Sequence, residues 1–397
     1  METLVKRHKQ QLANLRPTFR RQRIDEIQWN ERLVGIKGER GVGKTTLCLQ
    51  RIKEHFADSN QCLYVSLDDV SFPFASLLEL AERFSQRGGT HLFIDEIHKY
   101  PNWMLELKNI YDIFPDLSVV FTGSSVLHLD HSKADLSRRA VMYQLNGLSF
   151  REFLQIQSGK TFEKYSFAEL IANHEKITFD IVSQLKPLQF FNQYLQYGYY
   201  PFYLQNTETY GIKLSALINQ VIESDLPYLA QLNSEHINKL KRFLYLLSCQ
   251  VPFKPNISSL ATAMQLSRQT ISNYLHLLQK AGIITLLSAN NQKINSLAKP
   301  EKIFLQHPNY YFALGNENAN VGSIRETFFV NQLSYNQTIN TSDKGDFLVN
   351  GKYIFEIGGT SKKYTQIANL PDSYIVIDDI EFGIGNKIPL WLFGFLY

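Results

Sequence analysis

The chain has 397 residues, of which 44% are hydrophobic and 20% are charged, and its formal net charge is +4 at pH 7. This balance excludes a disordered or collagen-like chain, and the length predicts two or three domains of roughly 100 to 200 residues each. The mild positive charge is compatible with nucleic-acid binding without requiring it.

Targeting signals and cysteines point to a cytoplasmic protein. The longest apolar run, IPLWLFGFLY at the C-terminus, is about half of the ~20 residues that a membrane helix needs, so we expect a buried final strand and no membrane partner. The N-terminal METLVKRHKQQ lacks the apolar centre of a secretory signal. Cys48, Cys62 and Cys249 are odd in number and far apart, which favours reduced thiols over disulfides or a zinc site.

The first motif is GERGVGKT at residues 38–45. It matches G-x-x-x-x-G-K-[ST] in full and lies between a strand-like RLVGIKG and a helical KTTLCLQRIKEHF. In such a loop backbone N–H groups surround the β-phosphate, Lys44 reaches the β- and γ-phosphates, and the Thr45 hydroxyl binds Mg²⁺. The alternative is a glycine turn without a ligand. The predicted nucleotide-binding residues are Gly38, Glu39, Arg40, Gly41, Val42, Gly43, Lys44, Thr45 and Thr46.

The second motif is HLFIDEI at residues 91–97. A buried parallel strand that ends in Asp95 and Glu96 places both carboxylates at the edge of the sheet where α/β proteins bind ligands. We expect Asp95 to hold the Mg²⁺ shell and Glu96 to polarise the attacking water. An unrelated solvated acidic loop is the alternative, which the complete phosphate loop upstream disfavours.

A third strand, LSVVFTGSS at residues 117–125, ends in hydroxyl side chains. Thr122 and Ser124 are therefore candidates for contacting the γ-phosphate or its water. Ser124 or Ser125 can equally cap a following helix, and both roles are compatible.

These motifs resemble those of the prokaryotic AAA-type P-loop ATPases that carry a C-terminal restriction-endonuclease-like (DUF4143-type) domain. The resemblance rests on GERGVGKTT, LFIDEIHKYPNW, LKNIYD, VVFTGSS, ADLSRRA and GLSFREFL, in this order. It implies ATP as the nucleotide, Mg²⁺ as the metal, and a sensor role for Thr122 and the serines after it. It also implies an arginine that contacts the γ-phosphate, commonly from a neighbouring subunit of a homo-oligomer, and the matching residues are Arg138 and Arg139. Pairing of either arginine with Asp135 is the alternative.

Residues 256–288 read as helix, turn, helix and strand, the layout of a winged helix-turn-helix. Ser258 or Ser259 can cap the first helix and Ser267 the second, and we expect three apolar side chains to face a small core. If the module reads DNA, the contacts fall on the early turns of its second helix. Docking of a protein is the alternative, because few basic residues lie there. The apolar residues are Leu275, Leu278 and Ile283, and the DNA-reading candidates are Arg268, Gln269, Thr270 and Asn273.

The C-terminal segments RETFFVNQL, KGDFLVNGKYIFEIGG and TQIANL resemble the helix, hairpin and helix of a PD-(D/E)XK nuclease core. In that core acidic residues and a lysine bind a metal and activate water. Glu326, Asp346 and Glu356 match the acidic positions and Gln366 a later polar one. Gly358 stands where the lysine is expected, so we predict a nuclease-like fold without nuclease activity, with displacement of the lysine role to Lys362 as the alternative.

The predicted fold class is α/β. A three-layer AAA-type P-loop ATPase core (1–155) precedes a helical lid and winged helix-turn-helix (156–290) and a mixed α/β nuclease-like domain (291–397). Three functions remain open: an ATP-hydrolysing conformational switch that acts on an unknown protein or other macromolecular client, an ATPase that gates DNA cleavage, and a nucleotide-binding module with little turnover. Glu96 argues against the last of these, because a pure binder has little need of a water-positioning carboxylate.

Overall fold

The computed structural model describes most of the chain. The described ranges are 1–16, 19–56, 60–69, 72, 74–124, 136, 138–230, 232–289, 300–315, 319–361, 367 and 370–397. The chain divides into two compact units, Met1–Asn146 and Gly147–Tyr397. Each unit contains its own cluster of buried apolar side chains.

A parallel five-stranded sheet forms the centre of the first unit. Its strand order is β2-β3-β4-β1-β5, and every neighbouring pair is parallel. The strands are β1 (Leu33–Gly38), β2 (Cys62–Ser66), β3 (His91–Asp95), β4 (Ser118–Ser124) and β5 (Val141–Gln144). Because β1 and β3 both border β4, the loop after β1 lies at the same sheet edge as the carboxyl end of β3.

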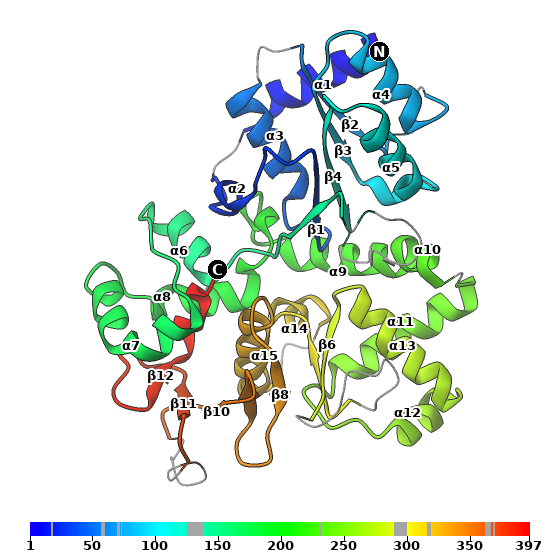
Figure 1. Cartoon of the computed structure of the whole chain (residues 1–397). Coiled ribbons are helices and arrows are strands. Elements are labelled where there is room, and N and C mark those ends of the chain that lie inside the picture. Colours follow the sequence, from blue (N-terminus) through cyan, green and yellow to red (C-terminus); the bar gives the residue numbers. More distant parts are fainter. Residues whose placement is uncertain are drawn as a thin grey trace. The chain divides into compact units, whose positions relative to one another are not determined.

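Helices cover both faces of this sheet. Figure 1 shows α1 and α3 on one face and α4 and α5 on the other. Apolar side chains at helical spacing turn inward, so Leu47 and Ile52 of α3, and Leu107 and Ile110 of α5, are buried. This confirms the predicted three-layer α/β core. The helices are α1 (Glu2–Asn14), α2 (Arg23–Glu26), α3 (Lys44–His55), α4 (Leu77–Ser85) and α5 (Trp103–Ile113), with a 3₁₀ turn η1 (Ile97–Lys99).

The second unit begins with helices. Ser149 and Ser166 cap α6 and α7 by accepting hydrogen bonds from backbone N–H groups three residues on, as expected for Ser-x-x-Glu sequences. The elements are α6 (Phe150–Ser158), α7 (Phe167–Val182), α8 (Leu188–Gln193), η2 (Tyr194–Gly198), η3 (Pro201–Leu204), α9 (Tyr210–Gln220), η4 (Val221–Asp225), α10 (Leu226–Ala230) and α11 (Ser234–Ser248).

The order predicted for residues 256–288 is present. It consists of α12 (Ile257–Met264), α13 (Arg268–Lys280) and β6 (Ile284–Leu287), and β6 pairs antiparallel with β7 (Lys302–Leu305). Ser267 caps α13, as predicted, and the three apolar side chains expected in a small core are buried. The cap predicted for α12 is wrong: the Asn256 side chain accepts from the backbone N–H groups of Ser258 and Ser259.

A second sheet, of order β12-β11-β10-β9-β8, follows helices α14 (Asn309–Ala313) and α15 (Val321–Leu333). Strands β8, β9 and β10 are antiparallel to one another in succession, whereas β10, β11 and β12 run parallel. The strands are β8 (Ile339–Thr341), β9 (Phe347–Val349), β10 (Tyr353–Gly358), β11 (Ser373–Ile377) and β12 (Lys387–Pro389).

The expected final strand is wrong. Most of the apolar C-terminal run forms a 3₁₀ helix, η6 (Leu390–Phe395), whose side chains are buried on all sides. Its Phe395 ring packs edge-on against Phe150 of α6, so the end of the chain completes the core of the helices that open this unit. A short run that is apolar throughout has no periodicity with which to tell a strand from a helix.

Two further expectations concerned membrane-spanning helices and the cysteine side chains. Within the described ranges no helix is long and apolar enough to cross a membrane. The three cysteines are free thiols, of which Cys48 and Cys62 are buried and Cys249 is exposed.

Candidate nucleotide-binding site

The phosphate loop joins β1 to α3. Gly41 and Gly43 adopt φ values of 86° and 97°, a left-handed conformation that glycine reaches without steric cost. Gly38, at the end of β1, has no room for a side chain, because a Cβ there would lie 2.2 Å from the carbonyl oxygen of Leu145. The loop then leads into Lys44, the first residue of α3, so the positive end of the helix dipole points into it.

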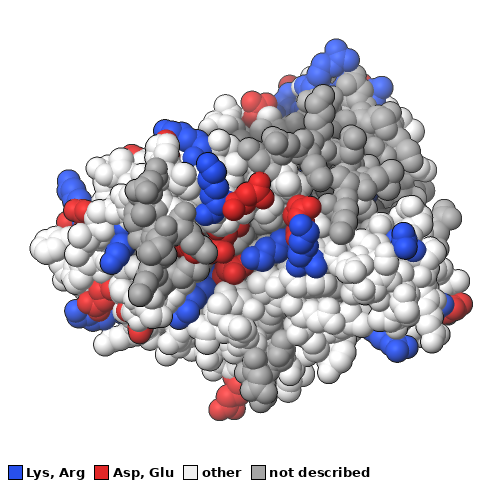
Figure 2. All heavy atoms as spheres, turned by 90° about the horizontal axis from the view of Figure 1, so that it is seen from below, with Lys and Arg blue, Asp and Glu red and all other residues white. Residues whose placement is uncertain are grey.

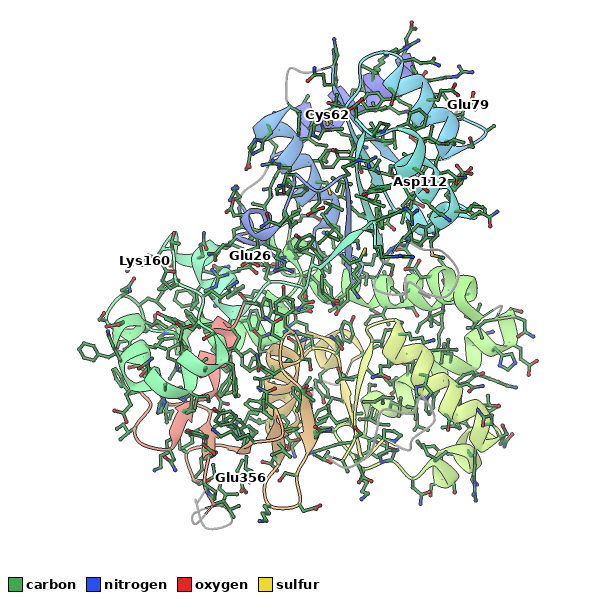
Figure 3. All side chains as sticks on the ribbon, in the orientation of Figure 1. Glu26, Cys62, Glu79, Asp112, Lys160 and Glu356 are labelled. Carbon is green, nitrogen blue, oxygen red and sulfur yellow. The ribbon has the colours of Figure 1, made fainter. Side chains whose placement is uncertain are left out.

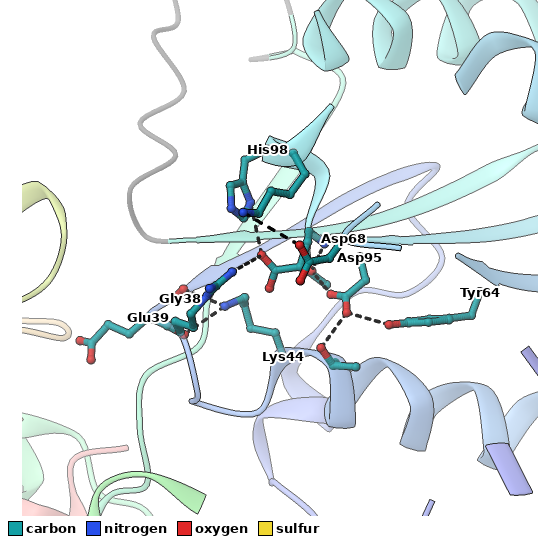
Figure 4. A network of polar contacts seen from close by, with 12 residues as sticks. Gly38, Glu39, Lys44, Tyr64, Asp68, Asp95 and His98 are labelled. Carbon is teal, nitrogen blue, oxygen red and sulfur yellow. Dashed lines mark hydrogen bonds and ion pairs between the residues drawn. The ribbon is translucent and has the colours of Figure 1, made fainter. Parts of the chain in front are cut away.

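The Lys44 ammonium group folds back onto this loop. Its Nζ donates hydrogen bonds to the carbonyl oxygens of Gly38 and Glu39, each at 3.0 Å, and the side chain is buried (Figure 4). Phosphate oxygens are stronger acceptors for an ammonium group than peptide carbonyls. The lysine is therefore positioned to exchange loop carbonyls for phosphate oxygens.

Asp95 stands at the centre of the polar network in Figure 4. Its Oδ2 accepts hydrogen bonds from the hydroxyls of Thr45 and Tyr64, both at 2.7 Å, and its Oδ1 accepts one from Thr122. The first bond connects the phosphate loop to the acidic strand. The carboxylate is 3% exposed, so these donors replace the water that it lost on folding.

Thr122 forms hydrogen bonds with both acidic residues. Its hydroxyl donates to Asp95 and accepts a hydrogen bond from the backbone N–H of Glu96 at 3.2 Å. This side chain, on the central strand β4, therefore fixes the turn that carries Glu96. Glu96 itself has a φ of 56°, which a non-glycine residue rarely adopts and which points to a functional constraint.

The Glu96 carboxylate lies among basic side chains. Its Oε2 is 3.4 Å from Nδ1 of His98 and 3.9 Å from a guanidinium nitrogen of Arg40, a residue of the phosphate loop. Burial raises the pKa of Glu96 above its usual value, and the nearby charge of Lys44 acts in the opposite direction. A raised pKa suits a group that must accept a proton near neutral pH.

The residues fit Mg²⁺ and a nucleotide phosphate. Thr45 and Asp95 provide two oxygen donors within hydrogen-bond distance of each other, and Mg²⁺ in phosphate sites typically keeps few protein ligands beside water and phosphate oxygens. Gly41 and Gly43 adopt a left-handed conformation and have no side chains that could block a phosphate at their positions. Bound Mg²⁺ would neutralise charge on the β- and γ-phosphates.

The other predicted residues of this region lie as follows. Ser124, the last residue of β4, is buried and pairs in register with Gly38 of β1. Arg139 forms a two-point ion pair with Asp112 of α5, with N–O distances of 2.9 and 3.1 Å, whereas Arg138 is exposed. Ser125 and Asp135 lie outside the described residues.

The acidic residues proposed for the nuclease-like site have these contacts. Glu326 forms an ion pair with Lys302 of β7 at 2.5 Å, and Asp346 accepts a hydrogen bond from the backbone N–H of Ile357 at 2.7 Å. Glu356 is buried in β10 (labelled in Figure 3). In the described part of the chain no three His, Cys, Asp or Glu side chains are placed to hold a metal ion. Lys362 and Gln366 lie outside that part.

Sequence reasoning missed Tyr64. It lies on the edge strand β2, whose register sets Ser66 beside Asp95, and only the strand order brings its side chain to the acidic strand. Burial, and then the charge of Asp95, raise the pKa of Tyr64, so its hydroxyl remains a donor. The pattern CLYVS carries no signal for this role.

We expect Tyr64→Phe to raise the Mg²⁺ concentration for half-maximal ATP turnover about tenfold. A hydrogen bond to a charged group contributes ~1.5 to 3 kcal/mol, and this one fixes the carboxylate that holds Mg²⁺. The measurement is turnover against Mg²⁺ concentration at saturating ATP.

Tyr100→Phe is the matched control for this change. It also removes a tyrosine–carboxylate hydrogen bond, to Glu106 at 2.9 Å, but not one to Asp95. Equal Mg²⁺ dependence in the two variants would contradict a positioning role for Tyr64.

Two family models match parts of the chain. Residues 30–154 match the family model of the AAA domain, and residues 188–311 match that of a domain of unknown function, DUF8612. An uncharacterized protein of Methanocaldococcus jannaschii is 28% identical over 308 residues, which cover 72% of this chain and 64% of that protein. The chain thus spans less than two thirds of this relative.

Two solved structures are similar to parts of the chain. AMPPCP-bound DnaA from Aquifex aeolicus is 13% identical over 65% of this chain and 84% of its own, with a TM-score of 0.27. The S. cerevisiae Hsp104–ADP complex is 17% identical over 69% of this chain and 41% of its own, with a TM-score of 0.32.

The family matches bear on two expectations. The family matched after the ATPase core is DUF8612, over residues 188–311, and not the expected DUF4143, whereas the restriction-endonuclease-like fold expected for residues 291–397 stays a prediction. The motifs behind it were short and loosely spaced, whereas the phosphate loop and acidic strand form one contiguous match. Residues 30–154 match the AAA domain, which supports the predicted AAA-type P-loop ATPase core.

Proposed function

We propose that the protein is an Mg²⁺-dependent ATPase that uses ATP binding and hydrolysis to switch its conformation and act on a macromolecular client in the cytoplasm. The observation that carries the proposal is the 2.7 Å hydrogen bond from Thr45 to Asp95, with Glu96 next in sequence. It joins the two halves of an Mg²⁺–phosphate site and places a proton-accepting carboxylate beside them.

Each side chain then has a role. Lys44 and the loop amides bind the phosphates, Thr45 and Asp95 hold Mg²⁺, and Thr122 orients both acidic residues. Glu96 orients the attacking water and accepts its proton. Adenine rather than guanine is expected from the AAA domain, since the sequence contains no guanine-reading Asn-Lys-x-Asp.

The switch is tested by hydrogen–deuterium exchange without nucleotide, with ADP and with a non-hydrolysable ATP analogue. A switch that reaches a client requires amides of Gly147–Tyr397 to differ in protection between ADP and the analogue. If only amides of residues 30–154 differ in protection, the nucleotide does not change the second unit, and the proposed switch is contradicted.

We also propose that Arg138 contacts the γ-phosphate of a neighbouring subunit in a homo-oligomer. Arg138 is exposed to solvent, whereas the neighbouring Arg139 is partly buried and forms a two-point ion pair with Asp112. We expect Arg138→Ala to lower kcat about 10³-fold with little change in ATP affinity.

Mixing variants tests whether this arginine acts between subunits. An equimolar mixture of Arg138→Ala and Lys44→Ala should recover activity, because an intact phosphate loop then meets an intact arginine from its neighbour. A mixture as inactive as its components would place the arginine elsewhere. Asp112→Asn, which frees Arg139, is the control that should leave kcat near the wild-type value.

DNA as a partner is supported by one observation. Arg268, Gln269 and Asn273 are exposed on the first turns of α13, behind the cap of Ser267. Against it, Gln269 donates a hydrogen bond to Asn273 at 3.0 Å, and Figure 2 shows Lys and Arg interspersed with Asp and Glu among the described residues of the face drawn. Duplex DNA that stimulates turnover in wild type but not in Arg268→Ala would establish this partner.

The remaining alternatives have less support. Glu326 is neutralised by Lys302, and the acidic residues of the second unit do not form a metal group in the described part, so DNA cleavage is not favoured. A module that binds nucleotide with little turnover leaves the geometry of Glu96 unexplained.

A further inference from the structure

A cavity of about 580 Å³ lies in the first unit, away from the phosphate loop. It is bounded by α1, by the start of β2 and by the end of α4. Figure 3 shows Cys62 on β2 next to α1. Apolar side chains form its floor: Val5 and Leu12 of α1, Leu63 of β2 and Phe84 of α4.

His8 places a polar group in this apolar wall. Its Nδ1 accepts a hydrogen bond from the backbone N–H of Tyr64 at 3.0 Å, on the outer side of the edge strand β2. Burial, and then the charge of Lys9, lower the pKa of His8, so the ring is neutral and its proton is on Nε2. His8 is 4% exposed as a residue and lines the cavity, and its Nε2–H has no hydrogen-bond partner among the described residues.

Two cations stand at the same cavity. Lys9 of α1 and Arg87, just after α4, both line it, and neither forms an ion pair within the described ranges. No carboxylate is among the lining side chains that the structure describes. An apolar floor, the imidazole N–H of His8 and two cations are complementary to a molecule with an apolar body and one acidic group.

We propose that this cavity is a regulatory site for a small organic acid with an apolar tail. The tail lies on the apolar floor, and the acidic group is bound by Lys9, Arg87 and the Nε2–H of His8. The site is two hydrogen bonds from the ATPase centre: His8 binds the Tyr64 amide, and the Tyr64 hydroxyl binds Asp95. A ligand that shifts His8 therefore shifts the residue that positions the Mg²⁺-binding carboxylate.

Decanoate is the probe, and calorimetric titration of the whole chain at saturating ADP is the test. We expect decanoate to bind at one site per chain, 1-decanol to bind at least about tenfold more weakly, and Arg87→Ala to weaken decanoate about tenfold, the effect of losing ~1.4 kcal/mol. Lys6→Ala is the matched control, since Lys6 lies on α1 but does not line the cavity.

Equal binding of decanoate and decanol, or equal loss in Arg87→Ala and Lys6→Ala, would overturn the acid-binding site. The regulatory part rests on the proposed ATPase function. It predicts that decanoate changes the Mg²⁺ dependence of turnover in wild type but not in Tyr64→Phe, and the same change in both would overturn it. Because calorimetry requires no turnover, failure of the site and failure of the ATPase are distinguishable.

Discussion

Lys44→Ala should weaken ATP binding by at least about 100-fold, equivalent to ~2.7 kcal/mol. The buried ammonium group is within 3.0 Å of two loop carbonyls and is the cation that a bound phosphate would meet first. Alanine keeps α3 intact because it is the best helix former, so the loss should fall on binding and not on folding. Titration with a fluorescent ATP analogue measures the affinity.

Lys53→Ala is the control for this change. Lys53 lies on the same helix, is exposed, and is remote from the loop. Both variants should melt within a few degrees of wild type, while only Lys44→Ala loses affinity. Unaltered ATP affinity in Lys44→Ala would contradict the assignment of residues 38–45 as a phosphate-binding loop.

Glu96→Gln should keep ATP affinity within a few-fold of wild type and lower kcat by about 10² to 10⁴, the range for loss of a positioned general base. Glutamine has the same shape and retains the backbone hydrogen bond to Thr122, but it cannot accept the proton of water. Glu82→Gln, at an exposed position of α4, should change neither quantity. Phosphate release under steady-state conditions measures kcat, and an undiminished kcat would assign the base to another group.

The pH dependence of turnover also tests the role of Glu96 as the general base. Because burial raises the pKa of Glu96, its carboxylate takes up a proton at a higher pH than an exposed glutamate does. Turnover should therefore fall as the pH is lowered through this raised pKa. The residual turnover of Glu96→Gln should not show this decrease at low pH.

The ATPase core was predictable because its chemistry is local in sequence. One contiguous loop carries the glycines, Lys44 and Thr45, and one strand carries Asp95 and Glu96 at its end. Parallel strand rules then put both at the same sheet edge without further information. In the structure a hydrogen bond from Thr45 to Asp95 connects the two motifs.

Contacts that depend on strand order were not predictable. Tyr64 reaches Asp95 only because β2 lies next to β3, and Arg40 approaches Glu96 only through the fold of the loop. His8 meets the Tyr64 amide because α1 covers the sheet edge. No spacing or residue pattern in the sequence predicts any of these three contacts.

The second unit was predicted less well because its signals are short. The helix-turn-helix order followed from caps and apolar spacing. The nuclease-like site was inferred from single acidic residues, and the structure pairs Glu326 with Lys302, a partner 24 positions away. The C-terminal run was apolar throughout, so its helical form was decided by packing against Phe150.

The central claim is that this site hydrolyses ATP with Mg²⁺. The most direct measurement is phosphate release from ATP by the purified wild-type chain, in Mg²⁺ and in EDTA, with bound nucleotide quantified in the same samples. We expect several ATP molecules to be hydrolysed per chain in Mg²⁺ and none in EDTA. Nucleotide bound in Mg²⁺ without phosphate release would contradict it and leave a binding module.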